Sequence, residues 1–179
     1  MLLKFRLFGW NCRFHWRAFK DLTEYVAGIT NKCADGRYIL FLDYDDVPEE
    51  WIIEEVGYLI EEYRLGNCYL FKSSKQGYHV ISTQKRSLRE LLQIMRDTST
   101  DDAYTYVSLR RARKVWTLRI SEKNGEQPTF IGTIPGYQEG DFSKPHNDVL
   151  RKLYNLRIPR AGEDGEKRFL TAHYHIAKN

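Results

Sequence analysis

One segment limits the fold more than any other, a nearly continuous apolar run over 37–43 that leads into an acidic cluster. The run reads Arg-Tyr-Ile-Leu-Phe-Leu-Asp, and Tyr44, Asp45 and Asp46 follow it. A short, apolar run of this kind is typical of a strand that is buried on both faces. Pro48 then predicts a helix over about 49–64, because proline is favoured in a first helical turn. We therefore expect a central buried strand followed directly by a helix.

Further strands and helices are expected on both sides of this unit. Alternating patterns predict strands over 1–8, 68–73, 78–83, 104–109, 115–121 and 128–134. Helical periodicity predicts helices over 15–29, after the capping residue Ser87, and over 147–156. The segments 68–73 and 78–83 would form one hairpin, and 104–109 with 115–121 a second. The order indicates an α+β fold with helices packed on a largely antiparallel sheet.

Length and composition favour a single soluble domain that binds a polyanion. The chain has 179 residues and a formal net charge of +4, and we expect one domain over 1–179 with a C-terminal extension over 125–179. The three cysteines, Cys12, Cys33 and Cys68, form no Cys-x-x-Cys pair, which disfavours a structural zinc ribbon. The sequence shows neither a secretory signal pattern nor an apolar run of membrane-spanning length. We therefore expect a cytoplasmic protein that does not insert into membranes.

The acidic cluster at the end of the buried strand is the first candidate site. Asp43 and Asp45 are two residues apart, so in a strand their side chains point to the same face. Two carboxylates held this close repel each other unless a cation lies between them, and their oxygens suit Mg²⁺ or Mn²⁺. The alternative is a solvated acidic turn, in which Asp46 and Glu49 favour the positive end of the following helix.

The predicted hairpin that follows the helix carries the second candidate site. Its turn contains Ser73, Ser74, Lys75 and Gly77, and His79 lies at the start of the next strand. Hydroxyls, an ammonium and a backbone freed by glycine would form a cradle for phosphate groups, to which His79 adds a donor. The alternative is an ordinary exposed turn with a half-buried histidine.

In their order along the chain, these two sites resemble the first two motifs of the archaeo-eukaryotic primase superfamily. That family has a strand ending in Asp-x-Asp, a helix, and a hairpin that commonly reads Ser-Gly-Arg-Arg-Gly-x-His. Ser73, Gly77 and His79 match this spacing, whereas Ser74 replaces the usual glycine and Lys75 supplies the cation. The resemblance covers about 37–121. It implies an RRM-like sheet with packed helices, the fold of a primase-polymerase catalytic core.

The resemblance also implies roles for individual residues. Asp43 and Asp45 would hold the catalytic metals, and Ser73, Ser74, Lys75 and His79 the triphosphate of an NTP or dNTP. The family supplies a third acid from a later segment, for which Asp102 is preferred here over Asp101. An arginine-bearing strand follows in the family, and the segment 115–121 resembles it, so Arg119 would reach phosphate or template.

Together these residues predict a DNA primase or primase-polymerase, a nucleotidyltransferase that uses two divalent ions to join nucleotides on single-stranded DNA. The basic segment formed by Arg110, Arg111, Arg113 and Lys114 would hold the template backbone by charge. The alternative for this segment is a solvated turn. Because the chain lacks the accessory parts of larger family members, we expect a helicase or a large primase subunit as a partner.

Two other classes of function compete with this prediction. His173 and His175 resemble the His-hydrophobic-His arrangement of HUH endonucleases, which nick single strands with a tyrosine nucleophile. Its candidate nucleophiles on predicted helices are Tyr25, Tyr58 and Tyr63. The other class is a non-catalytic module that binds single strands through sheet aromatics and the basic segment.

Overall fold

The apolar run over 37–43 forms the buried strand that its composition predicts. The structure, a computed structural model, describes residues 2–7, 10–15, 27–110, 115–122, 125–156 and 158. The run lies in β4 (Tyr38–Asp45), where Ile39 and Leu42 are completely buried and Phe41 is 1% exposed. The prediction that this strand is buried on both faces is therefore confirmed, but its predicted central place is wrong, because β4 is the edge strand of a four-stranded sheet.

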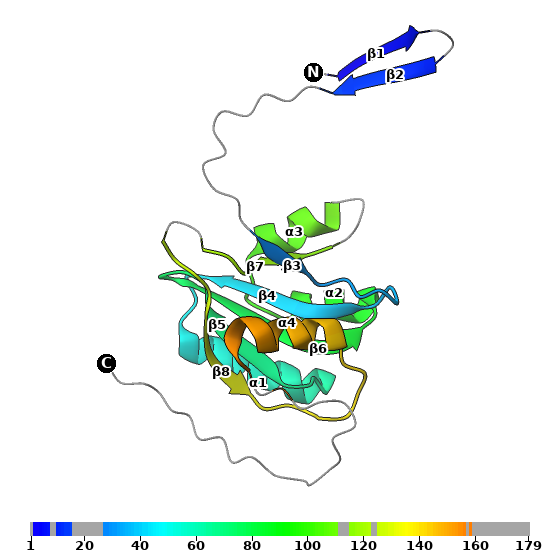
Figure 1. Ribbon diagram of the computed structural model, residues 1–179. Coiled ribbons are helices and arrows are strands. Elements are labelled where there is room, and N and C mark those ends of the chain that lie inside the picture. The colour runs from blue at the N-terminus through cyan, green and yellow to red at the C-terminus, as the bar shows by residue number, and fades with distance from the viewer. Residues whose placement is uncertain are drawn as a thin grey trace.

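Four antiparallel strands form the main sheet, in the order β4-β6-β5-β8 (Figure 1). The other three strands are β5 (Cys68–Lys72), β6 (Gly77–Arg86) and β8 (Thr129–Ile134). The helix α1 (Glu49–Tyr63) connects β4 to β5, and β6 then pairs with both of them. Since β4 and β5 are each antiparallel to β6, they run parallel to one another, in a split β-α-β arrangement.

The first two helices begin where their sequence signals place them. Pro48 directly precedes α1, and Glu49 and Glu50 occupy its first turn, where the helix dipole favours negative charge. The helix α2 (Leu88–Arg96) begins with a complete capping box, in which Ser87 and Glu90 each accept a backbone N–H of the other. The predicted helix starts at Pro48 and Ser87 are therefore confirmed.

The two faces of the sheet are covered by different helices (Figure 1). The helix α4 (Lys144–Tyr154) covers one face, where its His146 lies edge-on to Phe41 with ring centroids 6.5 Å apart. The other face meets α1, because the Tyr44 hydroxyl donates to Glu55 at 2.7 Å. Asp43 and Asp45 alternate with Tyr44 and so lie on the face that α4 covers. Asp45, the last residue of β4, is exposed.

The shorter strands correct one prediction. β1 (Leu2–Leu7) pairs with β2 (Trp10–His15), and β3 (Gly28–Thr30) pairs with β7 (Thr117–Arg119). A helix over 15–29 is wrong at both ends, since His15 and Gly28 are strand residues, and 16–26 lie outside the described residues. A local hairpin therefore determines the structure at His15, and pairing with a distant segment determines it at Gly28, although Ile29 fits a helical period.

The second predicted hairpin is also wrong, because its first arm is the helix α3 (Asp102–Arg110). The Tyr-Thr-Tyr-Val alternation over 104–107 is typical of a strand, but Asp101 begins a helix. Its carboxylate accepts the backbone N–H groups of Ala103 at 3.0 Å and Tyr104 at 3.1 Å. This cap satisfies donors that the first helical turn leaves unpaired, which favours the helix.

The C-terminal helix also begins earlier than its periodicity predicts. α4 starts at Lys144 rather than at Asn147, with Pro145 in its first turn. The chain thus has an α+β fold built from antiparallel sheets and a few helices, as predicted.

Gly57 offers a test of the helical assignment that is independent of function. It lies inside α1, and a Cβ added to it would meet no atom within 4 Å. Gly57→Ala is expected to stabilise the protein by about 0.5–1 kcal/mol, because alanine loses less backbone entropy in a helix. Thermal unfolding should show a melting temperature about 1–4 °C higher. A lower melting temperature would contradict the packing of α1 described above.

Candidate functional site

Strand pairing brings the two sequence motifs together. In the register of β4 with β6, Asp43 lies opposite His79 and Asp45 lies opposite Gly77. His79 Nε2 is 3.4 Å from Asp43 Oδ1, with 8% of the His79 side chain and 24% of the Asp43 side chain exposed. The carboxylates of the first motif and the histidine of the second therefore share one face of the sheet.

The hairpin turn packs closely around Gly77. A Cβ built on Gly77 would lie 2.6 Å from Ser74 Oγ, 2.7 Å from Ser73 Oγ and 3.1 Å from Asp45 Oδ1. Two hydroxyls and one carboxylate oxygen thus surround a point that only glycine leaves unfilled. The turn is held by the Ser73 N–H, which donates to the Gly77 carbonyl at 3.0 Å.

The end of β4 has an unusual backbone conformation at Asp46. Its φ of 60° is in the left-handed region, which aspartate adopts more readily than most residues. The Asp46 N–H donates to the Gln76 carbonyl at 3.0 Å, so the strand end is fastened to the hairpin turn. Left-handed residues outside glycine often occur at functional sites, where surrounding contacts offset their strain.

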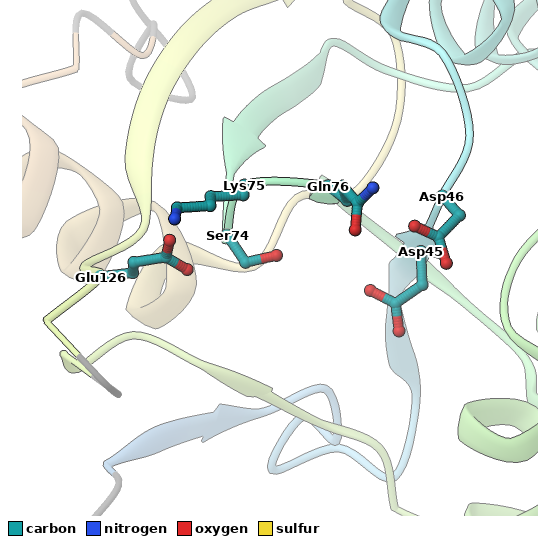
Figure 2. A pocket seen from close by; sticks show the side chains of 6 residues that line it. All are labelled: Asp45, Asp46, Ser74, Lys75, Gln76 and Glu126. Atoms are coloured by element: carbon teal, nitrogen blue, oxygen red, sulfur yellow. The ribbon is translucent and has the colours of Figure 1, made fainter.

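A cleft of about 470 Å³ opens between the strand end and the hairpin turn, lined by Asp45, Asp46, Ser74, Lys75, Gln76 and Glu126. Figure 2 shows Asp45 and Asp46 at one side of this cleft and Lys75 with Glu126 at the other. Sequence reasoning missed Glu126, because the pattern around Asn124 and Gly125 is weak. The cleft therefore combines three carboxylates with one ammonium.

Negative charge is concentrated at the strand end. The pKa of Asp45 is raised above its ordinary value, first by partial burial and then by the charges of Asp43, Asp101 and Asp46, while His79 acts in the opposite direction. A raised carboxyl pKa means that the folded protein disfavours the ionised form of Asp45. A bound cation would relieve this repulsion.

Asp101, rather than Asp102, adds its negative charge to the strand end. The Asp101 N–H donates to the Asp43 carbonyl at 2.9 Å, and the Asp101 carboxylate is one of the charges that raise the pKa of Asp45. Asp102 is exposed in the first turn of α3. The structure thus brings Asp101, which sequence reasoning ranked second, next to the strand end.

Arg119 reaches the hairpin but is engaged by main-chain carbonyls. Its Nη1 donates to Ser121 at 2.8 Å and to Glu126 at 2.9 Å, and its Nη2 donates to the Ser73 carbonyl. Through these contacts the guanidinium fixes the cradle residue Ser73 relative to the backbone of Glu126. The contacts that the structure describes for Arg119 therefore support the walls of the cleft.

Glu55 supports the strand end from the opposite face, a role that no sequence pattern indicated. Its carboxylate accepts the Tyr44 hydroxyl at 2.7 Å, and the Ser99 hydroxyl and N–H at 2.6 Å and 2.9 Å. Tyr44 separates Asp43 from Asp45, so fixing its ring also fixes the pleat that carries both carboxylates. The loop that contains Ser99 continues directly into Asp101.

The donors at the cleft fit a hard divalent cation that keeps water or substrate oxygens. Among the described residues, no group of three or more His, Cys, Asp or Glu side chains is arranged to enclose a metal ion. Mg²⁺ is usually bound by one or two carboxylates, with water and phosphate oxygens completing its shell. The carboxylate pair and the raised pKa of Asp45 suit such an open site.

Two of the predicted sites lie partly outside the described residues. Arg110 ends α3, and the other basic residues, Arg111, Arg113 and Lys114, lie outside the described residues. The same is true of the HUH candidates Tyr25, His173 and His175. Of the remaining tyrosines, Tyr58 is 58% exposed on α1, and the Tyr63 hydroxyl donates to Asp97.

Comparison with known proteins assigns no family. No family model matches the sequence, and no curated protein and no solved structure matches the chain. Within the described residues, the helices are too short or too polar to cross a membrane. The geometry of the cleft is therefore the basis for assigning a function.

Proposed function

We propose that the protein is a template-dependent nucleotidyltransferase, a DNA primase or primase-polymerase, that joins nucleotides on single-stranded DNA. One observation carries the proposal. The hydroxyls of Ser73 and Ser74 and the carboxylate of Asp45 lie together around Gly77, next to the facing pair of Asp43 and His79. Such a cleft has acceptors for a cation and donors for phosphate oxygens within one small volume.

The acidic side of the cleft is the proposed metal site for Mg²⁺ or Mn²⁺. Asp43 and Asp45 are its ligands, and Asp101 replaces Asp102 as the third acid because its charge acts on Asp45. Bound there, the ions would supply the Lewis acidity that activates a substrate hydroxyl and neutralises departing pyrophosphate. Glu55 and Tyr44 keep the two strand carboxylates in their relative positions.

The hairpin side of the cleft is the proposed site for the triphosphate of an NTP or dNTP. Ser73 and Ser74 donate hydroxyl hydrogens, Lys75 contributes its charge, and His79 orients the phosphate nearest to Asp43. Arg119 acts indirectly in this proposal, by holding Ser73 in place. Donors fixed before the substrate arrives stabilise developing charge at little reorganisation cost.

The fold supports the same proposal at a coarser level. The strand order β4-β6-β5, with α1 crossing between β4 and β5, is compatible with an RRM-like core. Arg110 and the basic residues after α3 are the proposed contacts for the template backbone. A helicase or large primase subunit remains the proposed partner, and the cytoplasm the proposed location.

Lys75 gives a direct test of the triphosphate site. Lys75→Gln is expected to weaken binding of a non-hydrolysable nucleoside triphosphate with Mn²⁺ by about tenfold, because it removes one charge-assisted contact. Lys72→Gln is the matched control, since Lys72 Nζ lies 3.7 Å from the Tyr78 ring centroid rather than in the cleft. Isothermal titration measures both affinities. Equal affinity of wild type and Lys75→Gln would contradict the assignment of this turn to phosphate.

A further inference from the structure

Tyr104 has a buried hydroxyl group without a hydrogen-bond partner in the described chain. It lies in the first turn of α3, and its backbone N–H donates to Asp101 Oδ2 at 3.1 Å. The Asp101 N–H in turn donates to the Asp43 carbonyl at 2.9 Å. The backbone of Tyr104 is thereby tied to the end of β4 through a single intervening residue.

An unpaired buried hydroxyl is unfavourable, so its presence requires a reason. Buried polar side chains in native proteins are nearly always hydrogen-bonded, because an unpaired group loses its contacts with water and gains nothing in return. The described residues contain five unpaired buried side-chain atoms, on Ser82, Arg86, Tyr104, Trp116 and Asn147. The contacts described for Ser82, Arg86, Trp116 and Asn147 involve none of the residues that line the cleft.

The electrostatic environment of Tyr104 distinguishes it from the other four residues. The pKa of its phenol is raised well above the ordinary value, mainly by burial and additionally by the negative charge of Asp43. The hydroxyl therefore keeps its proton across the physiological pH range. It is a neutral hydrogen-bond donor within electrostatic reach of a carboxylate assigned to the metal.

We propose that the Tyr104 hydroxyl is unpaired because its partner is an oxygen ligand, such as water, of the divalent ion held by Asp43. Tyr104 is then a positioning residue that acts on the metal site without binding the metal. This inference rests on the proposed function, because it requires the metal site at Asp43 and Asp45. Donors to the ligands of a bound metal orient those ligands and contribute to affinity.

The proposal predicts opposite effects of one substitution on stability and on metal binding. Tyr104→Phe removes only the hydroxyl, so the metal-free protein should melt about 2–4 °C higher than wild type. The affinity for Mn²⁺ should fall about tenfold, a typical effect of losing such a donor. Tyr58→Phe, on the exposed side of α1, is the control and should change neither quantity.

Thermal unfolding and the electron paramagnetic resonance signal of free Mn²⁺ measure these two quantities. Unchanged Mn²⁺ affinity in Tyr104→Phe would overturn the proposal, and so would a lower melting temperature without metal, which would show that the hydroxyl is already paired. The variant Asp43→Asn with Asp45→Asn separates this inference from the proposed function. If that variant binds Mn²⁺ as wild type does, the metal site itself is refuted, and Tyr104 has no role in it.

Discussion

Replacing Asp43 and Asp45 together by asparagine is expected to abolish nucleotide incorporation and to raise the melting temperature. Activity should fall about a thousandfold or more, because the variant loses both proposed metal ligands. Stability should rise because the folded protein disfavours the charge of Asp45, whose pKa is raised by burial and by neighbouring carboxylates. A functional site commonly lowers stability in this way.

The pH dependence of this stability has a defined sign. An aspartate with a raised folded-state pKa gives its largest stability at low pH, below the ordinary value of 3.8. This contribution is lost as the pH rises through the folded-state pKa, since the unfolded chain then releases its proton more readily. In the double asparagine variant the stability should not fall with rising pH for this reason. Melting temperatures measured at several pH values for wild type and variant will test this difference.

A second pair of aspartates provides the matched control for this double substitution. Asp35 and Asp141 contact Arg37 and Lys85 away from the cleft, and hydrogen bonds from these cations lower the pKa of both carboxyl groups. Asp35→Asn with Asp141→Asn should therefore lower the melting temperature at neutral pH and leave incorporation intact. A similar loss of activity in both double variants would show that the effect is structural.

Gly77→Ala is expected to weaken triphosphate binding by at least about tenfold while the protein still folds. The new Cβ would lie 2.6 Å from Ser74 Oγ and 2.7 Å from Ser73 Oγ, so both hydroxyls must rotate out of the cradle. Serine side chains rotate at modest cost, and Gly77 lies outside the glycines with positive φ, so the hairpin should persist. A displacement of about 1 Å in a positioned group is enough to cause such losses.

Binding of a non-hydrolysable nucleoside triphosphate with Mn²⁺ measures this effect, and circular dichroism checks the fold. Gly57→Ala is the matched control, because its Cβ meets no neighbouring atom, and it should bind the nucleotide as wild type does. If Gly77→Ala also binds with wild-type affinity, the serine hydroxyls around Gly77 do not hold phosphate.

The elements around the motifs were predictable because their signals are local. The apolar run of β4, the proline before α1 and the capping box at Ser87 each specify structure within a few residues. The two-residue period of a strand placed Asp43 and Asp45 on one face, and the resemblance placed His79 in the same site. The register of β4 with β6 then brought His79 opposite Asp43.

The parts that the sequence did not predict have weak local signals or depend on contacts between distant segments. The strand-like alternation after Asp101 predicts a strand where the chain forms α3, because a single capping residue is a weaker signal than the alternation. The pairing of β3 with β7 leaves no periodic signal in three-residue strands. Glu55 and Glu126 look like ordinary surface acids until the fold brings them to Tyr44 and to the cleft.

The most direct test of the central claim is extension of a primer on single-stranded DNA by one nucleotide. The wild-type protein is incubated with a labelled primed template, one complementary nucleotide, as NTP and as dNTP, and Mn²⁺. The predicted result is a primer that is one nucleotide longer with wild type and unchanged with the Asp43 and Asp45 double variant. An unextended primer with wild type, or a denaturation-resistant adduct between the protein and DNA formed without nucleotide, would contradict the account.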